Sequence, residues 1–256
     1  MADRLLHWAL MTPADLDAAI AHLPLALVPC GSLEWHGPHL ATGCDALRGQ
    51  AICTGVAERL GGGVVLPPLY TTAPGFCNWR GSISFTPALV KQLAAELYRE
   101  LDKCGFRYAF MHLAHAGAMQ EESFREPAAV YRAQSPMRIR VQAGPSRAVE
   151  PQLGPGHAGA DEAAELLAAE PRAVHLDRHD PAQTLLPKYE GCDPALYCQG
   201  LSEQHHEAVR QFMALEHYRW QEDLAQVVTP EAAWELLDAV CDALAQELRE
   251  WMGVET

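Results

Sequence analysis

The sequence has no apolar run long enough to cross a bilayer and no apolar leader. Its first eight residues, Met-Ala-Asp-Arg-Leu-Leu-His-Trp, contain no basic region followed by an apolar one, which is the pattern of a secretory signal. A membrane-spanning helix needs about 20 consecutive, mostly apolar residues. We therefore expect a cytoplasmic protein with no membrane partner.

Positive charge is also scarce. Lysine and arginine number 19 against 33 aspartates and glutamates, so the formal net charge is −14. Nucleic acids and anionic lipids attract basic proteins, so neither is an expected partner, whereas an acidic chain suits a protein that collects divalent cations. Hydrophobic residues at 49% and charged residues at 20% are globular values. We expect a single domain over residues 1–256.

Cysteine pairs of the CxxC type are absent. The eight cysteines, at positions 30, 44, 53, 77, 104, 192, 198 and 241, are scattered along the chain. In a chain of this length such scatter indicates reduced, mostly buried thiols of a cytosolic protein. Cys44 lies beside Asp45, and we expect it to serve packing.

What the sequence does contain is a dense polar run over residues 31–45, Gly-Ser-Leu-Glu-Trp-His-Gly-Pro-His-Leu-Ala-Thr-Gly-Cys-Asp. It follows an apolar stretch at 25–30 and offers Glu34, His36, His39 and Asp45. Carboxylate oxygens and imidazole nitrogens are the ligands that Zn²⁺, Mn²⁺ or Fe²⁺ take in catalytic sites. In extended backbone the first two project to the same side. The run predicts the rim of a metal site, and a polar turn that hydrogen-bonds only the backbone fits the spacing equally well.

Strand-like and helix-like segments alternate along the chain. Proline and threonine mark several helix starts, and glycine marks several helix ends. Expected strands cover residues 25–30, 64–66, 106–111 and 137–141; expected helices cover 14–22, 48–60, 87–103, 121–132, 203–220 and 230–251, and a further helix ends near 169. This alternation predicts an α/β fold, with a mainly parallel sheet and helices on both faces.

Two further polar clusters lie where such a sheet binds ligands. One contains His112 and His115 and follows the strand expected at 106–111. The other runs from His157 to Glu162 and opens a helix. A histidine beside a glycine in a loop is more often structural. Three clusters, each after a strand or at a helix start, favour a functional site at the carboxyl ends of the strands.

These clusters resemble, in chain order, the conserved blocks of the creatininase (creatinine amidohydrolase) family. The family patterns are GSxEQHGxHLP with a metal-binding aspartate shortly after, FPGTIS, NGHGGN and HAGxxET. The matching segments are Gly31-Ser-x-Glu34-x-His36-Gly-Pro-His39-Leu with Asp45, Trp79-Arg-Gly81-Ser-Ile-Ser, His115-Ala-Gly117 and His157-Ala-Gly-Ala-Asp-Glu162. The resemblance extends over residues 8–170, roughly.

The resemblance implies a three-layer α/β/α sandwich with a metal site, often dinuclear, at the carboxyl ends of the strands. It places Glu34 and His115 on one ion, His36 on the other, and Asp45 between the two. Glu162 stands at a position that binds metal or lies just behind it. One or two divalent ions per subunit (Zn, Mn or Fe) are the implied cofactor.

The resemblance also implies a reaction and an assembly. A bound divalent ion lowers the pKa of water to about 7, and His157 matches a histidine assigned to proton transfer. The other interpretation of His157 is that it caps the following helix. We expect a hydrolase acting on a small cyclic amide, formamide or ring-ketone-type substrate, and a homo-oligomer, hexameric or otherwise built from dimers.

Departures from the family pattern bear on the substrate. Trp35 replaces a glutamine, and Phe76 falls where a histidine often stands. Ala114 and Ala118 replace glycine and asparagine, and Gly117 occupies the position of a glutamate ligand in creatininase proper. Creatinine is therefore not the expected substrate, and a cyclic, partly apolar molecule is favoured.

Residues 175–228 depart most from the family, and we expect a lid or a subunit contact there. His205 and His206 look like ligands, but adjacent helix positions point about 100° apart, so a solvated or interface helix is the better interpretation. Two alternatives to a hydrolase remain. One is a metal-dependent isomerase or lyase of a sugar or carbocyclic ketone, because the same ligands serve both reactions. The other is a non-catalytic binding protein.

Overall fold

The computed structural model describes residues 5–144, 149, 153–154, 156–181, 187–220 and 223–253. At its centre lies a parallel sheet with the strand order β2-β1-β4-β5, and a short strand, β3, pairs with the end of β1. The strands are β1 (Leu25–Gly31), β2 (Val64–Val65), β3 (Leu69–Tyr70), β4 (Tyr108–Leu113) and β5 (Arg138–Ala143). The predicted parallel sheet is confirmed.

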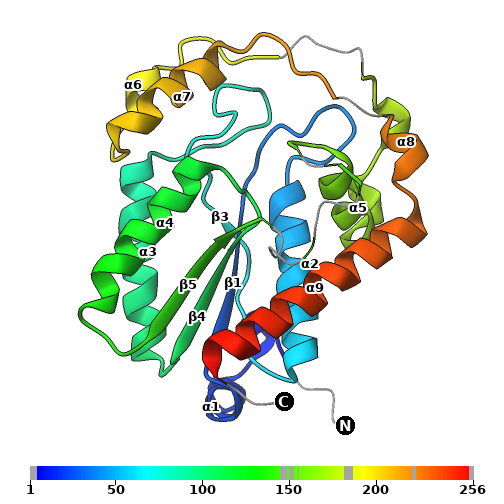
Figure 1. The fold of residues 1–256 in the computed structure, drawn as a ribbon. Helices are drawn as coiled ribbons and strands as arrows, with labels where there is room; N and C mark the ends of the chain where they lie inside the picture. The colour runs from blue at the N-terminus through cyan, green and yellow to red at the C-terminus, as the bar shows by residue number, and fades with distance from the viewer. Residues whose placement is uncertain are drawn as a thin grey trace.

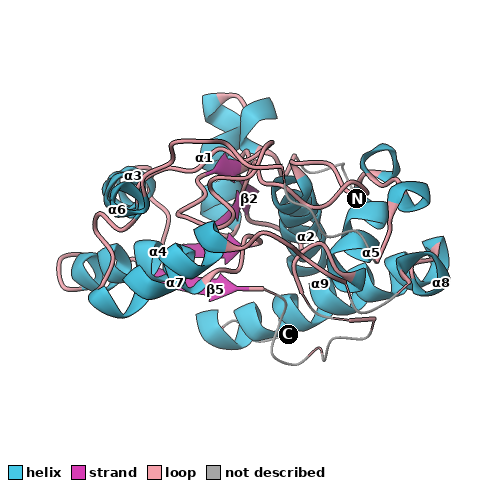
Figure 2. Cartoon of the chain, turned by 90° about the horizontal axis from the view of Figure 1, so that it is seen from above, coloured by secondary structure: helices cyan, strands magenta, loops and turns pink. Residues whose placement is uncertain are grey.

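Helices cover both faces of the sheet (Figure 1). On one face lie α1 (Pro13–His22), α3 (Pro87–Lys103) and α4 (Ala118–Arg132). On the other lie α2 (Cys44–Leu60), α5 (Ala160–Ala169) and α9 (Pro230–Met252). Figure 2, seen from above, shows the strands between these two layers. The fold is therefore the expected three-layer α/β/α sandwich.

The strands are apolar on both sides because each side faces a helical layer. In β1, Leu25 and Leu27 join the core beneath α2, α5 and α9, whereas Ala26 and Val28 join the core beneath α3 and α4. All four are fully buried, and burial of a leucine or valine side chain contributes about 1.5–3 kcal/mol. This two-sided burial fixes the strand in the middle of the sheet.

Helix boundaries follow the predicted capping residues. Thr12, Thr86 and Thr229 each accept a hydrogen bond from the helix that they precede, and a proline follows each of them. Gly61 and Gly253 end α2 and α9 with φ of 70° and 73°, values that glycine adopts without steric cost.

Two boundaries differ from the prediction in ways that shape the site. α2 begins at Cys44 instead of residue 48, so Asp45 lies on its first turn. Gly31 allows this approach, because a Cβ there would lie 2.4 Å from the backbone nitrogen of Ala46. β4 ends at Leu113 instead of residue 111, so His112 lies inside the strand.

The helix predicted over residues 203–220 is wrong in its second half. α7 covers Glu203–Ala214 and ends where Leu215 adopts a ψ of 127°. Residues 216–220 are not helical, and their Tyr218 and Trp220 side chains pack against the aromatic residues of the site. The burial of these two rings outweighs the helical periodicity of the local sequence.

Short elements lie above the carboxyl ends of the strands (Figure 1, top). They are η2 (Pro171–Ala173), η3 (Leu176–Arg178), α6 (Pro194–Tyr197), α7 and α8 (Leu224–Val227); η1 (Trp8–Leu10) precedes α1. Among the described residues, no helix is both long and apolar enough to span a membrane.

Candidate metal centre

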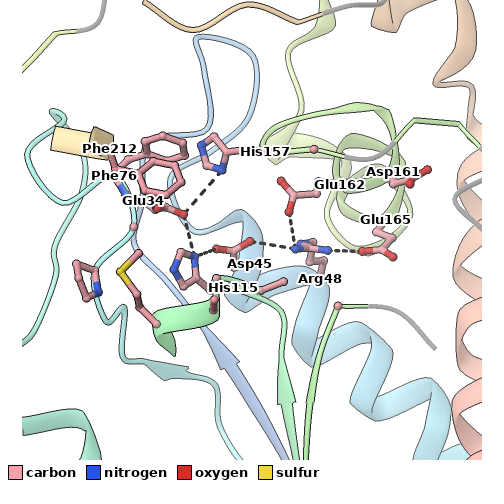
Figure 3. Close-up of a pocket in the computed structure, with 18 of the residues that line it drawn as sticks. Glu34, Asp45, Arg48, Phe76, His115, His157, Asp161, Glu162, Glu165 and Phe212 are labelled. Atoms are coloured by element: carbon pink, nitrogen blue, oxygen red, sulfur yellow. Dashed lines mark hydrogen bonds and ion pairs between the residues drawn. The ribbon is translucent and has the colours of Figure 1, made fainter. Parts of the chain in front are cut away.

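The six residues predicted for the site lie together at the carboxyl ends of β1 and β4, and most of them are labelled in Figure 3. The loop after β1, the first turn of α2, the loop after β4 and the start of α5 supply them. They are Glu34, His36, Asp45, His115, His157 and Glu162.

Glu34, Asp45 and His115 form one group of converging donors, which we call the first subsite. The Nδ1 atom of His115 lies 3.0 Å from Oε2 of Glu34 and 3.4 Å from Oδ2 of Asp45. Two donors that bind one ion at about 2.1 Å and a tetrahedral angle lie about 3.4 Å apart. The three side chains are buried and have the spacing of a coordination shell.

His36, Asp45 and Glu162 form a second group, the second subsite. The Nε2 atom of His36 lies 3.3 Å from Oδ1 of Asp45 and 3.5 Å from Oε2 of Glu162. The other ring nitrogen, Nδ1, lies 3.0 Å from the backbone oxygen of Glu34, and a carbonyl can only accept, so Nδ1 carries hydrogen. Asp45 thus offers one carboxylate oxygen to each subsite.

Buried polar atoms without partners show that the donors fit a cation. Within the described part of the chain, Nε2 of His36 and Oε2 of Glu34 are buried and make no well-aligned hydrogen bond, and their nearest ionisable neighbours are other donors of the site, Asp45 at 3.3 Å and His115 at 3.0 Å. Native proteins rarely leave such atoms unsatisfied. A divalent ion held by oxygen and nitrogen donors would satisfy both. Cys44 lies close enough to His36 and Asp45 to join them, but burial raises the pKa of its thiol well above the usual value.

Backbone and hydroxyl groups fix the orientation of the carboxylates. The Phe76 N–H donates to Oε1 of Glu34 over 2.8 Å. The Ser32 hydroxyl donates to Oδ2 of Asp45 over 2.5 Å. The Ala158 N–H donates to Oε2 of Glu162 over 2.7 Å. These contacts hold the donors where the subsites need them.

The pKa shifts show how strongly the site attracts positive charge. Burial would raise the pKa of Glu34, but His115 and other neighbouring imidazoles lower it to about 2. Burial would lower the pKa of His36, but Asp45, Glu162 and Glu34 raise it to about 9. Glu34 and Asp45, whose pKa values are both lowered, therefore stay ionised and stabilise a cation between them, whereas burial raises the pKa of Glu162.

His157 lies beside the subsites with one ring nitrogen free to accept a proton. Its Nε2 donates to the backbone oxygen of Trp35 over 2.5 Å, so Nδ1 is the unprotonated nitrogen of the neutral ring, and it lies 3.9 Å from Oε2 of Glu34. Burial and the charge of His36 lower the pKa of His157 to about 3. The residue at the N-cap of α5 is Gly159, so His157 does not occupy the capping position.

An apolar cavity of about 630 Å³ opens above the donors. Phe76 packs on the His157 ring with 4.2 Å between centroids, and Tyr218 meets the same ring edge-on at 5.8 Å. The apolar wall is formed by loops and by helices α4, α7 and α9. Its residues include Pro74, Phe76, Met119, Phe212, Tyr218 and Leu236. Most of the lining is apolar, and the donors of both subsites lie at its base, so an apolar body and a polar reacting group both fit.

Other histidines of the motifs lie outside the donor set. His39 faces the backbone oxygen of Ala158 through Nε2, over 3.0 Å. His112 is buried in β4, and burial lowers its pKa to about 3. On α7, His205 lines the cavity whereas His206 contacts the backbone oxygen of Leu201. These two neighbours point apart, as expected from their helical positions.

Four residues of the site were not predicted. Arg48 and Glu165 form a buried ion pair next to Glu162, and Phe212 and Tyr218 line the cavity. A signal existed for Glu165, because it is the lone charge in the apolar segment Ala163–Ala169 and lies three positions after Glu162, on the same helical face.

The chain belongs to the creatininase (creatinine amidohydrolase) family, whose model matches residues 9–248. It is similar to the mycofactocin precursor peptide peptidase of Mycolicibacterium smegmatis, with 33% identity over 104 residues, 38% of this chain and 42% of that protein. It is also similar to the creatinine amidohydrolase of Pseudomonas putida, with 30% identity over 95 residues, 35% of this chain and 36% of that protein. The matches thus span about two fifths of each curated relative.

Solved structures share the fold over almost the whole chain. A structure of creatininase Mn superimposes with a TM-score of 0.67 at 23% identity, and the match covers 96% of this chain and 98% of that one. At this identity the likeness shows the fold alone. The family and its fold are established on these grounds.

Proposed function

We propose that the chain is a divalent-metal-dependent hydrolase that cleaves the C–N bond of a small, partly apolar amide. The observation that carries this proposal is the convergence of carboxylate and imidazole donors on two adjacent positions beneath an apolar cavity. One ion would be held by Glu34, Asp45 and His115, and a second by His36, Asp45 and Glu162. Oxygen and nitrogen donors of this kind suit Zn²⁺, Mn²⁺ or Fe²⁺.

The geometry of the site supports a separate role for each residue in the proposed reaction. A divalent ion supplies, when bound, a Lewis acid that polarises a carbonyl and makes water a nucleophile near neutral pH. Asp45 offers one carboxylate oxygen to each subsite and so fixes the separation of the two subsites. The Phe76 N–H bonds Oε1 of Glu34 and thereby orients Oε2 toward the first subsite. His157 accepts through Nδ1 the proton that the attacking water loses. The same nitrogen then gives this proton to the leaving amine as the C–N bond breaks.

The cavity restricts the substrate. Its walls are largely apolar and aromatic, and Arg48, the permanent cation among its described lining residues, is paired with carboxylates. A substrate with an uncharged ring or side chain beside the scissile amide fits these walls. The names of both curated relatives, a peptidase and an amidohydrolase, describe cleavage of C–N bonds. Lactams, formamides and short amides of apolar residues are therefore the first candidates.

We further propose that α7 and residues 215–220 form a cover over the cavity, since Phe212 and Tyr218 line it. This supports the lid interpretation of the divergent segment. The homo-oligomer and the cytoplasmic location remain proposals alongside it.

A substrate screen tests the proposed function. The purified protein is loaded separately with Zn²⁺, Mn²⁺ or Fe²⁺ and incubated with lactams, formamides and peptide amides, and the amine released is measured. We expect metal-dependent amine release that His157→Asn lowers by at least about a hundredfold and that His206→Asn, a matched change outside the cavity, leaves intact. Cyclic ketones are tested as a second set of substrates. Turnover of a ketone without any amine release would replace the hydrolase by an isomerase or lyase.

A further inference from the structure

Arg48 is a buried cation that the proposed mechanism does not use, and it lies beside the second subsite (Figure 3). It lies on the second turn of α2, three positions after Asp45. It donates hydrogen bonds to Oδ1 of Asp45 (3.2 Å), Oε1 of Glu162 (2.7 Å), Oε2 of Glu165 (2.6 Å) and the backbone oxygen of Ala114. Arg48 is 4% exposed and Glu165 2%. Because an unpaired buried charge is costly, these contacts hold the guanidinium in one position.

The contacts of Arg48 fall unequally on the two subsites. Asp45 turns Oδ2 to the first subsite and Oδ1 to the second, and Arg48 contacts Oδ1. Glu162 belongs to the second subsite alone, and its oxygens accept from Arg48 and from the Ala158 N–H. At the first subsite, the Ser32 hydroxyl is a neutral donor to Asp45. The cationic donor therefore acts on the second subsite.

This asymmetry has an electrostatic consequence. A guanidinium keeps its positive charge at every pH that a folded protein tolerates. Charges in a buried site interact more strongly than in water, since the surroundings screen them less. Arg48 therefore repels a dication at the second subsite and competes for the oxygens of Asp45 and Glu162, whereas the first subsite has Glu34, a carboxylate that Arg48 does not contact in the described structure.

We propose that Arg48 makes the two subsites unequal, so that one ion binds tightly at Glu34, Asp45 and His115 while a second ion binds weakly and exchanges with solution. This inference rests on the proposed metal centre and adds the residue that sets its occupancy. Glu165 is a positioning residue for Arg48, since it holds the guanidinium from the side away from Asp45.

Metal titration of the stripped protein tests the inference without any substrate. The full chain is treated with a chelator, and Mn²⁺ is added while heat and the Mn²⁺ electron paramagnetic resonance signal are followed. We expect the first equivalent to bind at least about tenfold more tightly than the second, in line with the usual size of coupling between charged sites. The signal should change from that of isolated ions to that of coupled pairs only at the higher Mn²⁺ concentration.

Two variants separate the charge of Arg48 from other causes of unequal binding. R48Q/E165Q removes one positive and one negative charge together and leaves two amides that can bond each other. It should tighten the second equivalent at least about tenfold and change the first less than about threefold. Arg48→Lys keeps the charge and should retain the weak second equivalent.

The outcomes distinguish the inference from the proposed function. Equal affinities in the unsubstituted protein would overturn the inference and leave the metal centre standing, as would an unchanged second equivalent in folded R48Q/E165Q. If that variant fails to fold, equal binding in the unsubstituted protein or a tightened second equivalent in Arg48→Lys, which keeps the charge, still overturns the inference. No Mn²⁺, Zn²⁺ or Fe²⁺ binding at all would instead overturn the proposed function.

Discussion

The Nδ1 atom of His157 lies 3.9 Å from Oε2 of Glu34, and the opposite ring nitrogen donates to the backbone oxygen of Trp35. Because Nε2 of His157 is held by this hydrogen bond, the ring can exchange a proton only through Nδ1, the nitrogen that faces Glu34. His157 lies farther from Oε2 of Glu34 than His115 does, 3.9 Å against 3.0 Å, although His157, Glu34 and His36 are together close enough to hold an ion. This relationship is the basis on which we propose His157 as the proton carrier beside the metal centre.

Replacement of His157 by asparagine should therefore remove catalysis and keep the metal. We expect turnover to fall roughly 10²–10⁴-fold, the usual worth of general acid–base catalysis, with metal content unchanged by elemental analysis. His36→Asn should lose metal as well as activity, because it removes a donor. Normal turnover in His157→Asn would show that its position beside Glu34 has no role in proton transfer.

Gly75 is packed against two of the proposed ligands. A Cβ at this position would lie 2.1 Å from Oε1 of Glu34 and 2.7 Å from Cε1 of His115. Gly75→Ala should therefore displace Glu34 and weaken metal binding by at least tenfold, roughly the effect of losing an orienting contact. Calorimetric titration with Zn²⁺ measures this. Gly43→Ala is the control, since its nearest neighbour is 3.8 Å away, and equal affinities in the two variants would contradict the prediction.

Glu122 anchors the cover and should make its stability depend on pH. Burial would raise the pKa of Glu122, but Ser202 and Lys91 lower it to about 2, and His205 on α7 also contacts it at 2.8 Å. Because the folded pKa lies below the unfolded value of about 4.5, the stabilisation is full above pH 4.5 and is lost as pH falls toward 2.

Urea unfolding at several pH values checks this prediction. Glu122→Gln should be less stable than the unsubstituted protein by about 1–3 kcal/mol at pH 7, and the difference should shrink as the pH is lowered toward 3. Glu207→Gln changes an exposed glutamate of α7, the helix that carries His205, and serves as the control. A difference that is constant from pH 7 to pH 3 would mean that the ionised carboxylate contributes nothing.

The cover and the segment 187–197 before it carry apolar side chains that a homo-oligomer would bury. Tyr189, Leu196, Phe212 and Leu215 are 37–48% exposed, and exposed apolar groups of this kind mark contact surfaces. We expect light scattering at micromolar concentration to give the mass of an oligomer, and Leu196→Glu to weaken it. Val130→Glu, a change on α4 at a residue that is 63% exposed, is the control. A clean monomer would refute the assembly.

The sequence was sufficient to predict the layers of the fold and the six residues brought together at the site. Apolar strands such as β1 and capped helices such as α1 and α9 depend on local patterns, which a single sequence displays. The polar run after β1 and the motif at His157 were likewise continuous in the sequence. That the whole chain forms one domain stays a prediction.

The rest of the site depends on contacts between distant segments. The partners of Arg48, Glu162 and Glu165, lie more than a hundred positions away in the sequence. No local sequence pattern therefore predicts these ion pairs. Residues 216–220 have a helical composition, but the burial of Tyr218 and Trp220 against Trp35 determines their conformation. Tertiary packing of this kind overrides weak local propensity.

Metal content of Asp45→Ala tests the central claim most directly. Asp45 offers an oxygen to each subsite, so its loss should disturb both. Elemental analysis of the purified protein should find one or two divalent ions per subunit, and Asp45→Ala should lose most of them, whereas the exposed Asp17→Ala should keep them. Full occupancy in Asp45→Ala would contradict the metal centre described here.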